Sequence, residues 1–441
     1  MWTPVQKLFP CALLWPLALA LFCSVTEAAE EAPPDSTQEA DAPSDLLTRV
    51  NAKAATDQTV EVVRWLAQRR QLRLNGVDYG FTGLPFLYYS PNTGWNYGAR
   101  VQWADYSRRP YRYKFTLHLH RSIEGKHNFY LRLKVPHISE TGFGLQLRLS
   151  LQRDLRTRYY GLGNLSDLNR NYVDPTHDDF KDENFYFYTL DRPRLLFTLI
   201  RDIVGPLSMT TNFGLERSDV SNRGTTAFYL EEGTPDGVKD GVTGLLGISL
   251  VWDTRDDETI PRAGTFHEWS YETSRNSILG LFFEEIDFRR YTFTDAHYYP
   301  LSQRLNLAHR MVFEVLEGTI PLYAFGEIGG SRRVKGLGGN DNLRGFDTQR
   351  FTDNIRFFSN TELRYFLSSM RLYKQYLEWH GVLFADTGRV WPSLGLVEPT
   401  NVHLTGGAGF RLYWNSDFVI RLDFGRSSEQ SNLRIKLRNI F

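Results

Sequence analysis

The sequence contains almost no cysteine: both residues of this type, Cys11 and Cys23, lie within the first 28 positions of a 441-residue chain. This excludes a disulfide-stabilised scaffold. Acidic and basic residues number 51 each, so no excess positive charge favours binding to nucleic acid. After the first thirty residues the sequence also lacks an apolar run of the ~18 residues that a membrane-spanning helix needs. A helical membrane protein is therefore excluded as well.

A long apolar run does occur at the N-terminus. Lys7 precedes the apolar residues 8–25, and Thr-Glu-Ala, ending at Ala28, follows them. This is the order of regions in a secretory signal peptide, so we predict a signal peptide over residues 1–28 and export through the inner membrane. An uncleaved anchor is the alternative, which two prolines within the run disfavour. A mature chain without cysteine suits an oxidising compartment.

The segment after the predicted cleavage site is acidic. Residues 29–48 are rich in Ala, Pro, Ser and Thr and contain six acidic and no basic residues, a composition typical of a solvated linker. Apolar residues then recur at a roughly helical period from Asp45 to Arg73, which predicts a short amphipathic helix. We assign residues 29–83 to a periplasmic linker. From residue 49 onward the chain keeps 50 basic and 44 acidic residues and is mildly basic.

From about residue 84 onward, apolar and polar residues alternate with the period of a β-strand that has two different faces. Leucine occupies every second position from 145 to 151, and Leu433, Ile435 and Leu437 repeat the pattern near the C-terminus. A soluble two-sheet sandwich is one interpretation of such alternation. Segments of ~10 residues, aromatic residues near their ends, and Arg and Lys on the polar faces favour a transmembrane barrel with a polar lumen.

The sequence thus predicts an all-β fold, an antiparallel transmembrane β-barrel of about sixteen strands over residues 84–441. The count is sixteen if 184–203 is one strand, whereas a break at Pro193 would remove 84–90 from the barrel. If 184–203 is one strand, residues 156–183 lie outside the cell, whereas a break at Pro193 places them in the periplasm. Because periplasmic turns of such barrels are usually short, the unbroken strand is favoured. The expected strands are 84–90, 95–106, 112–122, 126–138, 143–154, 184–203, 207–219, 243–255, 265–275, 284–297, 304–318, 355–369, 376–390, 403–415, 418–427 and 432–441.

A long irregular stretch between strong strands runs from Gly326 to Asn354, with the motif Asn-Leu-Arg-Gly-Phe at residues 342–346. Loops of this length are usually functional or disordered. If the loop folds back into a wide lumen, it buries the guanidinium of Arg344, which then needs a carboxylate with fork geometry. Asp386 is the candidate partner.

This motif resembles the Arg-Gly-Phe/Tyr signature at the tip of the sixth extracellular loop in the BamA/TamA-type outer-membrane barrel superfamily, also called the bacterial surface antigen family. Residues 381–391 are similar to that family's Phe-x-Asp-x-Gly strand, and residues 253–264 are similar to its mid-barrel periplasmic turn. The terminal Phe441 is similar to the signal by which assembly machinery recognises outer-membrane barrels.

The resemblance implies a contact that holds the long loop in the lumen. Gly345 permits a tight turn at the loop tip, and Phe346 is expected to pack against Phe384 inside the barrel. The residues that the resemblance assigns to this loop–lumen contact are Arg344, Gly345, Phe346, Phe384, Asp386 and Gly388.

The resemblance also implies a function in the cell outer membrane, namely the insertion or translocation of proteins through a weak seam between the first and last strands. Residues 29–83 leave no room for a periplasmic POTRA domain, so the chain looks like a branch with the barrel alone. Outer-membrane lipid, periplasmic chaperones and client outer-membrane proteins are the expected partners. The alternative is a structural or pore-forming barrel that passes small solutes, with a mild preference for anions because of Arg148 and Arg434.

No catalytic site, cofactor or metal is expected, so the chain is not predicted to be an enzyme. His118 and His120 share one face of a strand at a spacing that could hold a metal, but a polar lumen is the simpler interpretation. The glycine-rich residues 161–163 and 336–339 are not followed by the Lys-Ser/Thr of a phosphate-binding loop. The sequence also contains no Gly-x-Ser-x-Gly nucleophile elbow.

Overall fold

The computed structural model describes residues 70–441 except for 91–92, 106, 109–110, 139–140, 167, 238–239, 259, 275–285, 332, 373–374, 415–417 and 437–439. The predicted signal peptide over residues 1–28, both cysteines, and the predicted linker and helix as far as residue 69 lie outside the described residues. Within the described part, none of the helices has the length and apolarity needed to cross a lipid bilayer.

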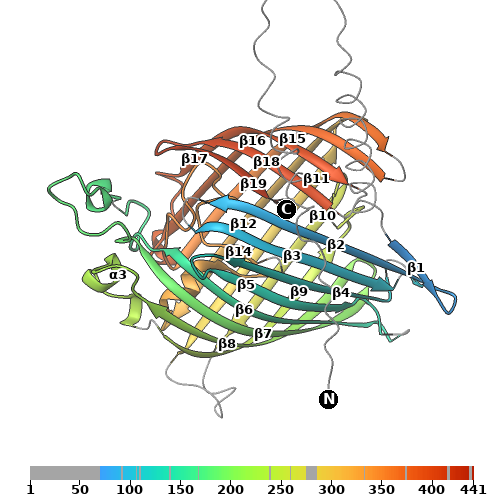
Figure 1. The fold of residues 1–441 in the computed structure, drawn as a ribbon, viewed down its shortest axis with the longest axis horizontal. Coiled ribbons are helices and arrows are strands. Elements are labelled where there is room, and N and C mark those ends of the chain that lie inside the picture. Colours follow the sequence, from blue (N-terminus) through green and yellow to red (C-terminus); the bar gives the residue numbers. More distant parts are fainter. Residues whose placement is uncertain are drawn as a thin grey trace, which may run out of the picture. The chain divides into compact units, whose positions relative to one another are not determined.

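Within the described residues, seventeen strands form one antiparallel sheet in which each strand pairs with the next one along the chain (Figure 1). Two further short strands lie in the long loop and form a separate sheet. The strands of the large sheet are β1 (Arg70–Leu74), β2 (Val77–Ser90), β3 (Gly94–Asp105), β4 (Tyr113–Ser122), β5 (His127–Val135), β6 (Phe143–Arg158), β7 (Phe187–Val204), β8 (Leu207–Ser221), β9 (Gly241–Asp253), β10 (Gly264–Thr273), β11 (Phe288–Pro300), β12 (Leu305–Gly318), β15 (Ile355–Leu372), β16 (Gln375–Trp391), β17 (His403–Trp414), β18 (Phe418–Arg426) and β19 (Ser431–Lys436).

The strands from β2 to β12 and from β15 to β19 match the sixteen predicted segments, which confirms the predicted fold class. The unbroken version of β7 is correct, because Pro193 lies within this strand and stands opposite Leu151 of β6. Figure 1 shows the meander curving round so that its last strand, β19, comes to lie near β2.

The sheet begins earlier than residue 84. Strand β1 pairs with the start of β2 across a two-residue turn, Asn75-Gly76, in which both residues have positive φ, 51° and 79°. Asn-Gly is a strong signal for this type of hairpin turn. The predicted helix as far as Arg73 is therefore wrong in its last residues, because the alternation of Leu72 and Leu74 with polar neighbours follows the strand and not the helical period.

Side chains alternate between the lumen and the outer surface. On β10, Phe266 and Glu268 are buried toward the lumen, whereas Trp269 is 53% exposed on the outer face. Outward aromatic rings of neighbouring strands pack in pairs, such as Trp269 with Phe293, whose ring centroids lie 5.6 Å apart. This apolar outer face fits contact with lipid.

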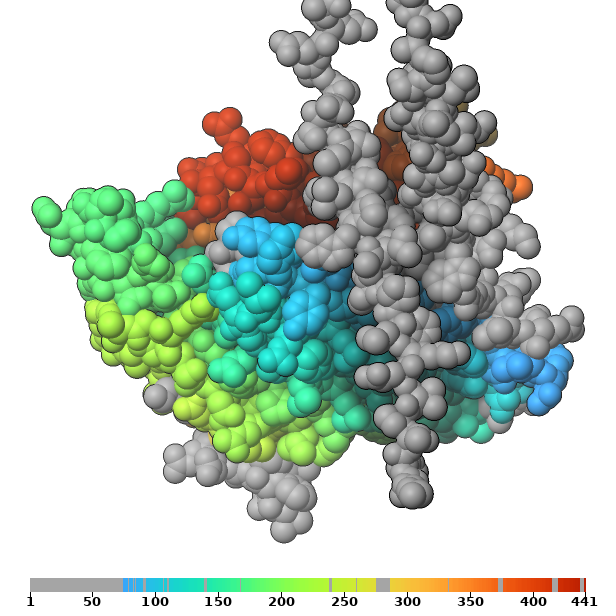
Figure 2. Space-filling view, viewed as in Figure 1, coloured from blue at the N-terminus to red at the C-terminus, as the bar shows by residue number. Residues whose placement is uncertain are grey.

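Three long loops meet at one end of the barrel. In the β6–β7 loop, the amide of Gly163 donates to the carbonyl of Thr352 in the β12–β15 loop at 2.8 Å. In the β8–β9 loop, which holds the short helix α3 (Phe228–Glu231), the amide of Phe228 donates to the carbonyl of Phe185 at 2.6 Å. Figure 2 shows the β6–β7 and β8–β9 loops, in green and yellow-green, side by side at this end. The extracellular location of this end stays a prediction.

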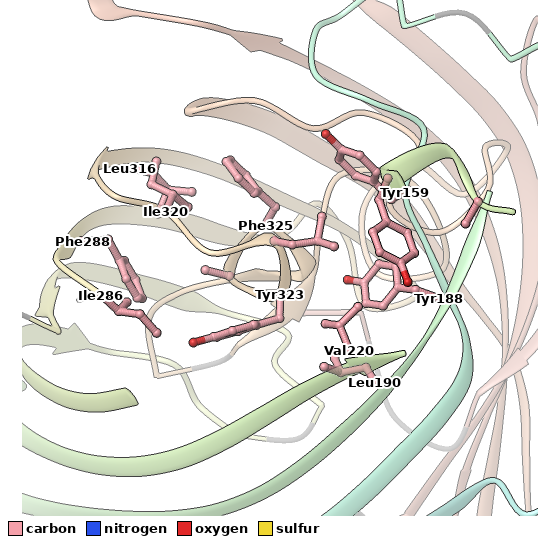
Figure 3. Close-up of a cluster of buried hydrophobic side chains, with 14 of the residues drawn as sticks. Tyr159, Tyr188, Leu190, Val220, Ile286, Phe288, Leu316, Ile320, Tyr323 and Phe325 are labelled. Carbon is pink, nitrogen blue, oxygen red and sulfur yellow. The ribbon is translucent and has the colours of Figure 1, made fainter. Parts of the chain in front are cut away.

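A hydrophobic cluster fixes the point at which the β12–β15 connection enters the barrel. Tyr323 and Phe325 belong to the short helix η4 (Leu322–Gly326) and lie between side chains of β11 and β12 on one side and of β7 and β8 on the other (Figure 3). The hydroxyl groups of Tyr323 and Thr243 lie 2.5 Å apart. Burial of these two rings directs the chain into the lumen.

Candidate functional site

The loop over residues 326–354 forms an ordered structure. It contains the paired strands β13 (Glu327–Ile328) and β14 (Val334–Lys335), followed by a turn around Asn342. The side chain of Asn342 is fully buried; its Oδ1 accepts from the amides of Gly338 and Leu343 at 2.8 and 2.7 Å, and its Nδ2 donates to the carbonyl of Lys335 at 3.1 Å. These bonds hold the loop tip in one conformation and position the next residues.

Arg344 projects from this tip into a set of acidic side chains. Its Nε and Nη2 donate to the two carboxylate oxygens of Asp386 at 2.9 and 2.7 Å, which is the bidentate fork geometry. Its Nη1 donates to Oε1 of Glu362 at 2.6 Å and lies 3.5 Å from Oδ2 of Asp423. The guanidinium carbon stands 3.4 Å from the centroid of the Phe384 ring. The side chain of Arg344 is 1% exposed, so this contact is fully desolvated.

Three more arginines complete the charge balance around Arg344. Arg411 donates to Glu362 and to Asp423 at 2.8 and 2.5 Å, and Arg364 donates to the second oxygen of Glu362 at 2.8 Å. Arg421 contacts Asp423 and Asp341 at 3.3 and 3.4 Å. The residues of this loop–lumen network are Arg344, Arg364, Arg411, Arg421, Asp341, Glu362, Asp386 and Asp423, four of each sign.

The neighbouring carboxylates determine whether Arg344 stays protonated. Burial by itself would lower the pKa of Arg344, but the carboxylates of Asp386 and Glu362 outweigh burial and raise the pKa above its ordinary value. Arg344 therefore stays charged at every physiological pH. A buried pair of this kind positions the loop, since removing one partner leaves an uncompensated buried charge.

Two glycines let the loop approach the barrel wall closely. A Cβ at Gly345 would lie 2.7 Å from the backbone of Arg426 and Ser427, and a Cβ at Gly388 would lie 3.0 Å from the carbonyl oxygen of Phe357. A Cβ at Gly388 would also meet the side chain of Leu337 of the loop at 3.1 Å. Both positions need a residue without a side chain for steric reasons.

Phe346 is buried as expected, but its partners differ from the expected one. Its ring lies 5.1 Å from that of Phe351 and 5.5 Å from that of His403, within a cluster that also contains Phe358. The Phe384 ring lies instead beneath the guanidinium of Arg344. The expectation of a Phe346–Phe384 contact overlooked the fact that a planar cation stacks on an aromatic face.

The C-terminal Phe441 turns into the lumen. It is 2% exposed and packs with Phe266 and Tyr298, and the guanidinium carbons of Arg310 and Arg364 lie 4.9 and 5.2 Å from its ring centroid. The terminal ring therefore belongs to the same lumenal interior as the loop contact. Its function as an assembly signal stays a prediction.

Sequence reasoning missed the partners of Arg344 other than Asp386. Glu362 and Arg364 on β15, and Arg421 and Asp423 on β18, stand at alternate positions of strands whose intervening residues, Leu363 and Leu422, are apolar. This placement of charge on a single face was a usable signal that these side chains point into the lumen. It did not reveal which of the many lumenal charges would meet the loop tip, because that depends on the stagger of strands distant in sequence.

Comparison with protein families identifies the architecture. The model of the Omp85 superfamily domain matches residues 64–433. The chain belongs to the Omp85 superfamily. This membership confirms the resemblance predicted from the Arg-Gly-Phe motif, and it makes the chain a Gram-negative outer-membrane protein.

Solved structures resemble this Omp85 barrel in fold. CdiB from Escherichia coli shares 11% identity at a TM-score of 0.50, with 81% of this chain and 61% of that chain covered. BamA from Haemophilus ducreyi lacking POTRA domains 1–3 shares 10% identity at a TM-score of 0.49, with 87% and 77% covered. CdiB from Acinetobacter baumannii shares 12% identity at 0.43, with 83% and 60% covered. The chain thus spans about six tenths of each CdiB chain. No curated protein matches it by sequence.

Proposed function

We propose that this Omp85 barrel inserts proteins into the outer membrane, or translocates them across it, at the seam between β2 and β19. The observation that carries this proposal is a physical link between the loop and the last strand. Asn432 of β19 donates to the carbonyl of Gly345 at 3.1 Å, and Arg434 of β19 donates to the carbonyl of Phe346 at 3.0 Å. The buried Arg344 contact therefore holds, through the loop tip, the strand that borders the seam.

The proposed seam lies between strands that are far apart in the sequence. β2 ends at Ser90 and β19 begins at Ser431, so no connecting turn holds this junction together, unlike the successive strand pairs of the meander. A junction that a lumenal loop supports can open for a client strand while the other strand pairs stay intact. A client strand would then add by β-augmentation to the edge of β2 beyond Phe81, where the pairing with β1 ends.

The same loop crosses the lumen. Glu327 pairs with Arg192 and Arg194 of β7 at 3.0 and 2.8 Å, and Lys335 pairs with Asp154 of β6 at 3.2 Å. Arg344, further along the loop, pairs with residues of β15, β16 and β18. The loop thus binds to walls on different sides of the barrel, which argues against a permanently open solute channel.

The proposal predicts catalysis of client folding in reconstituted membranes. The mature protein is placed in liposomes, a urea-denatured small outer-membrane barrel is added, and its folded fraction is followed by heat-modifiable migration on gels. We expect faster folding than in empty liposomes. A disulfide between β2 and β19, introduced into the mature chain as a cysteine pair, should remove the acceleration, and reductant should restore it. Equal rates with and without the protein would refute the insertion function.

The second candidate function is the passage of small anions. Arg100, Arg132 and Arg148 face the lumen from β3, β5 and β6, and within the described structure their buried Nε atoms have no hydrogen-bond partner. The guanidinium carbons of Arg132 and Arg148 lie 5.9 and 4.8 Å from the centroid of the Tyr130 ring. Such a patch attracts anions.

A further inference from the structure

A polar cluster interrupts the apolar outer face of the barrel. On β10 and β11 the outward side chains include the aromatic pair Trp269 and Phe293, and the next outward pair in the register is His267 and Asp295. His297 follows Asp295 on the same face, two residues along β11. Two imidazoles and a carboxylate thus replace the aromatic residues that precede them.

The three side chains are in direct contact. His267 Nδ1 lies 2.6 Å from Oδ1 of Asp295, and His297 Nε2 lies 3.0 Å from Oδ2. One ligand atom from each side chain lies within 4.8 Å of the others. The side chains of His267, Asp295 and His297 are 23%, 13% and 28% exposed. The group is therefore partly desolvated yet open to an ion from outside.

The cluster lies near the end of the barrel that carries the short turns. His267 is the fourth residue of β10, and His297 is the fourth residue from the end of β11 at Pro300. Four residues at ~3.3 Å each on a strand tilted by about 40° amount to a depth of roughly 10 Å. An ion from the aqueous phase can reach this depth. A carboxylate facing lipid there needs a positive partner.

We propose that His267, Asp295 and His297 form a binding site for a divalent transition metal ion of the Zn²⁺ class. Two imidazoles and one carboxylate, with water in the fourth position, are a recurrent tetrahedral donor set for zinc. Bonds of about 2.0–2.1 Å place tetrahedral ligand atoms roughly 3.3 Å apart. The three ligand atoms already lie within 4.8 Å of one another, so small side-chain rotations suffice to bring them around one ion. The ion replaces the imidazole protons that now contact Asp295, and it joins β10 to β11.

The competing interpretation is that the imidazoles only neutralise the carboxylate of Asp295. The chain offers a matched control for this interpretation. On β16, His380 Nε2 lies 3.2 Å from Oε2 of Glu378, and within the described residues no third acidic or histidine ligand groups with this pair. Residues 29–441 contain no cysteine, so no thiolate competes for the ion.

The experiment is calorimetric titration of ZnCl₂ into the untagged mature protein, purified with a chelator and exchanged into detergent without phosphate. We expect one saturable site. His267→Ala and His297→Ala should each weaken binding by at least about tenfold, since even outer-shell changes at metal sites cost roughly 10- to 100-fold. His380→Ala should leave the affinity unchanged. Wild-type binding that neither cluster variant weakens would overturn the proposal, as would the absence of a saturable site.

A second measurement distinguishes the loss of metal binding from a failure of the variant to fold. Each variant is first shown to migrate as the heat-modifiable folded form on gels, and His267→Gln replaces His267→Ala if needed. Saturating Zn²⁺ should then raise the unfolding temperature of the wild type and of His380→Ala, because a ligand that binds only the folded state stabilises it. An equal rise in the His297→Ala variant would contradict the site.

Discussion

At the scale of single residues, the loop–lumen contact depends on Arg344 because this side chain combines three properties. It is planar, so it can stack on Phe384 and form a fork with Asp386. It is permanently charged, so it offsets Glu362 and Asp423 as well. It stands beside Gly345, whose missing side chain lets the backbone touch the turn at Ser427. Substituting any of these groups should loosen the loop.

Arg344→Ala should lower the free energy of unfolding by about 3–5 kcal/mol, because it leaves buried carboxylates without their partner. Asp386→Ala should have a similar effect, and the double variant should lose less than the sum of the two. Arg344→Lys should be intermediate, since lysine keeps the charge and loses the fork. The measurement is the temperature at which heat-modifiable migration changes on gels. Unaltered behaviour in both single variants would contradict the pair.

Gly388→Ala should destabilise the loop by about 1–3 kcal/mol, because the added methyl group meets the backbone of Phe357 and the side chain of Leu337. Gly406→Ala on β17 is the matched control, since a Cβ at that glycine meets nothing within 4 Å. Trypsin cleavage in the 326–354 loop measures the effect. Equal cleavage rates in the two variants would show that the space at Gly388 is unimportant.

At the scale of elements, alternation was sufficient to predict all sixteen barrel strands, because every second residue faces either lipid or lumen. The bounds were less predictable where alternation is weak. β2 begins at Val77, ahead of residue 84, since Gly80 and Gly83 have no side chains that mark a face. β6 extends beyond residue 154, its expected end, because Thr157 and Arg158 still pair with Tyr188 and Phe187 of β7.

The candidate site was predictable only in part. Arg344 and Asp386 could be paired from sequence because a buried guanidinium needs a carboxylate and because the family resemblance points to Asp386 as that carboxylate. Glu362 and Asp423 could not be selected, since their meeting depends on the stagger of β15 and β18 around the barrel. The cluster of His267, Asp295 and His297 was missed for the same reason: the register between β10 and β11 alone places His267 opposite Asp295.

The terminal residue Phe441 is part of the hydrophobic interior of the barrel. Phe441→Ala should lower the free energy of unfolding by about 3–5 kcal/mol, as expected for removing a buried ring. Phe441→Leu keeps most of the apolar volume and should cost less than about 1.5 kcal/mol. Denaturant unfolding of the purified, refolded protein measures both. If Phe441 served only as an assembly signal, both variants would unfold like the wild type.

The β13–β14 pair gives the loop a pH dependence with a defined sign. Burial would raise the pKa of Glu327, but Arg192, Arg194 and Arg333 outweigh burial and hold the pKa well below its ordinary value. The folded-state pKa is therefore lower than the unfolded value of ~4.3. The resulting stability is present above the unfolded value and is lost as the pH falls through the folded one.

Glu327→Gln should therefore cost about 1–3 kcal/mol at neutral pH. The difference in unfolding temperature between wild type and variant should stay constant from about pH 8 to pH 5 and shrink at lower pH. Far-UV circular dichroism at several pH values measures this difference. A difference that already shrinks between about pH 8 and pH 6 would show that another group controls the loop.

At the scale of the whole molecule, the lumen holds an anchored loop, and no connecting turn joins β2 to β19. The loop tip reaches from the Arg344 contact to the side chains of Asn432 and Arg434 on β19. The two candidate functions use different routes: a protein client uses the seam, and a small anion uses the lumen past Arg148. An experiment can distinguish these two routes, because a disulfide between β2 and β19 closes the seam and leaves the lumen unchanged.

The most direct test is single-channel conductance of the mature protein in planar bilayers, with and without a disulfide between β2 and β19. We expect small, flickering openings that the disulfide abolishes and reductant restores, since opening requires the seam. Large, stable openings that persist with the disulfide in place would rule out a gated seam and would assign the barrel to solute passage.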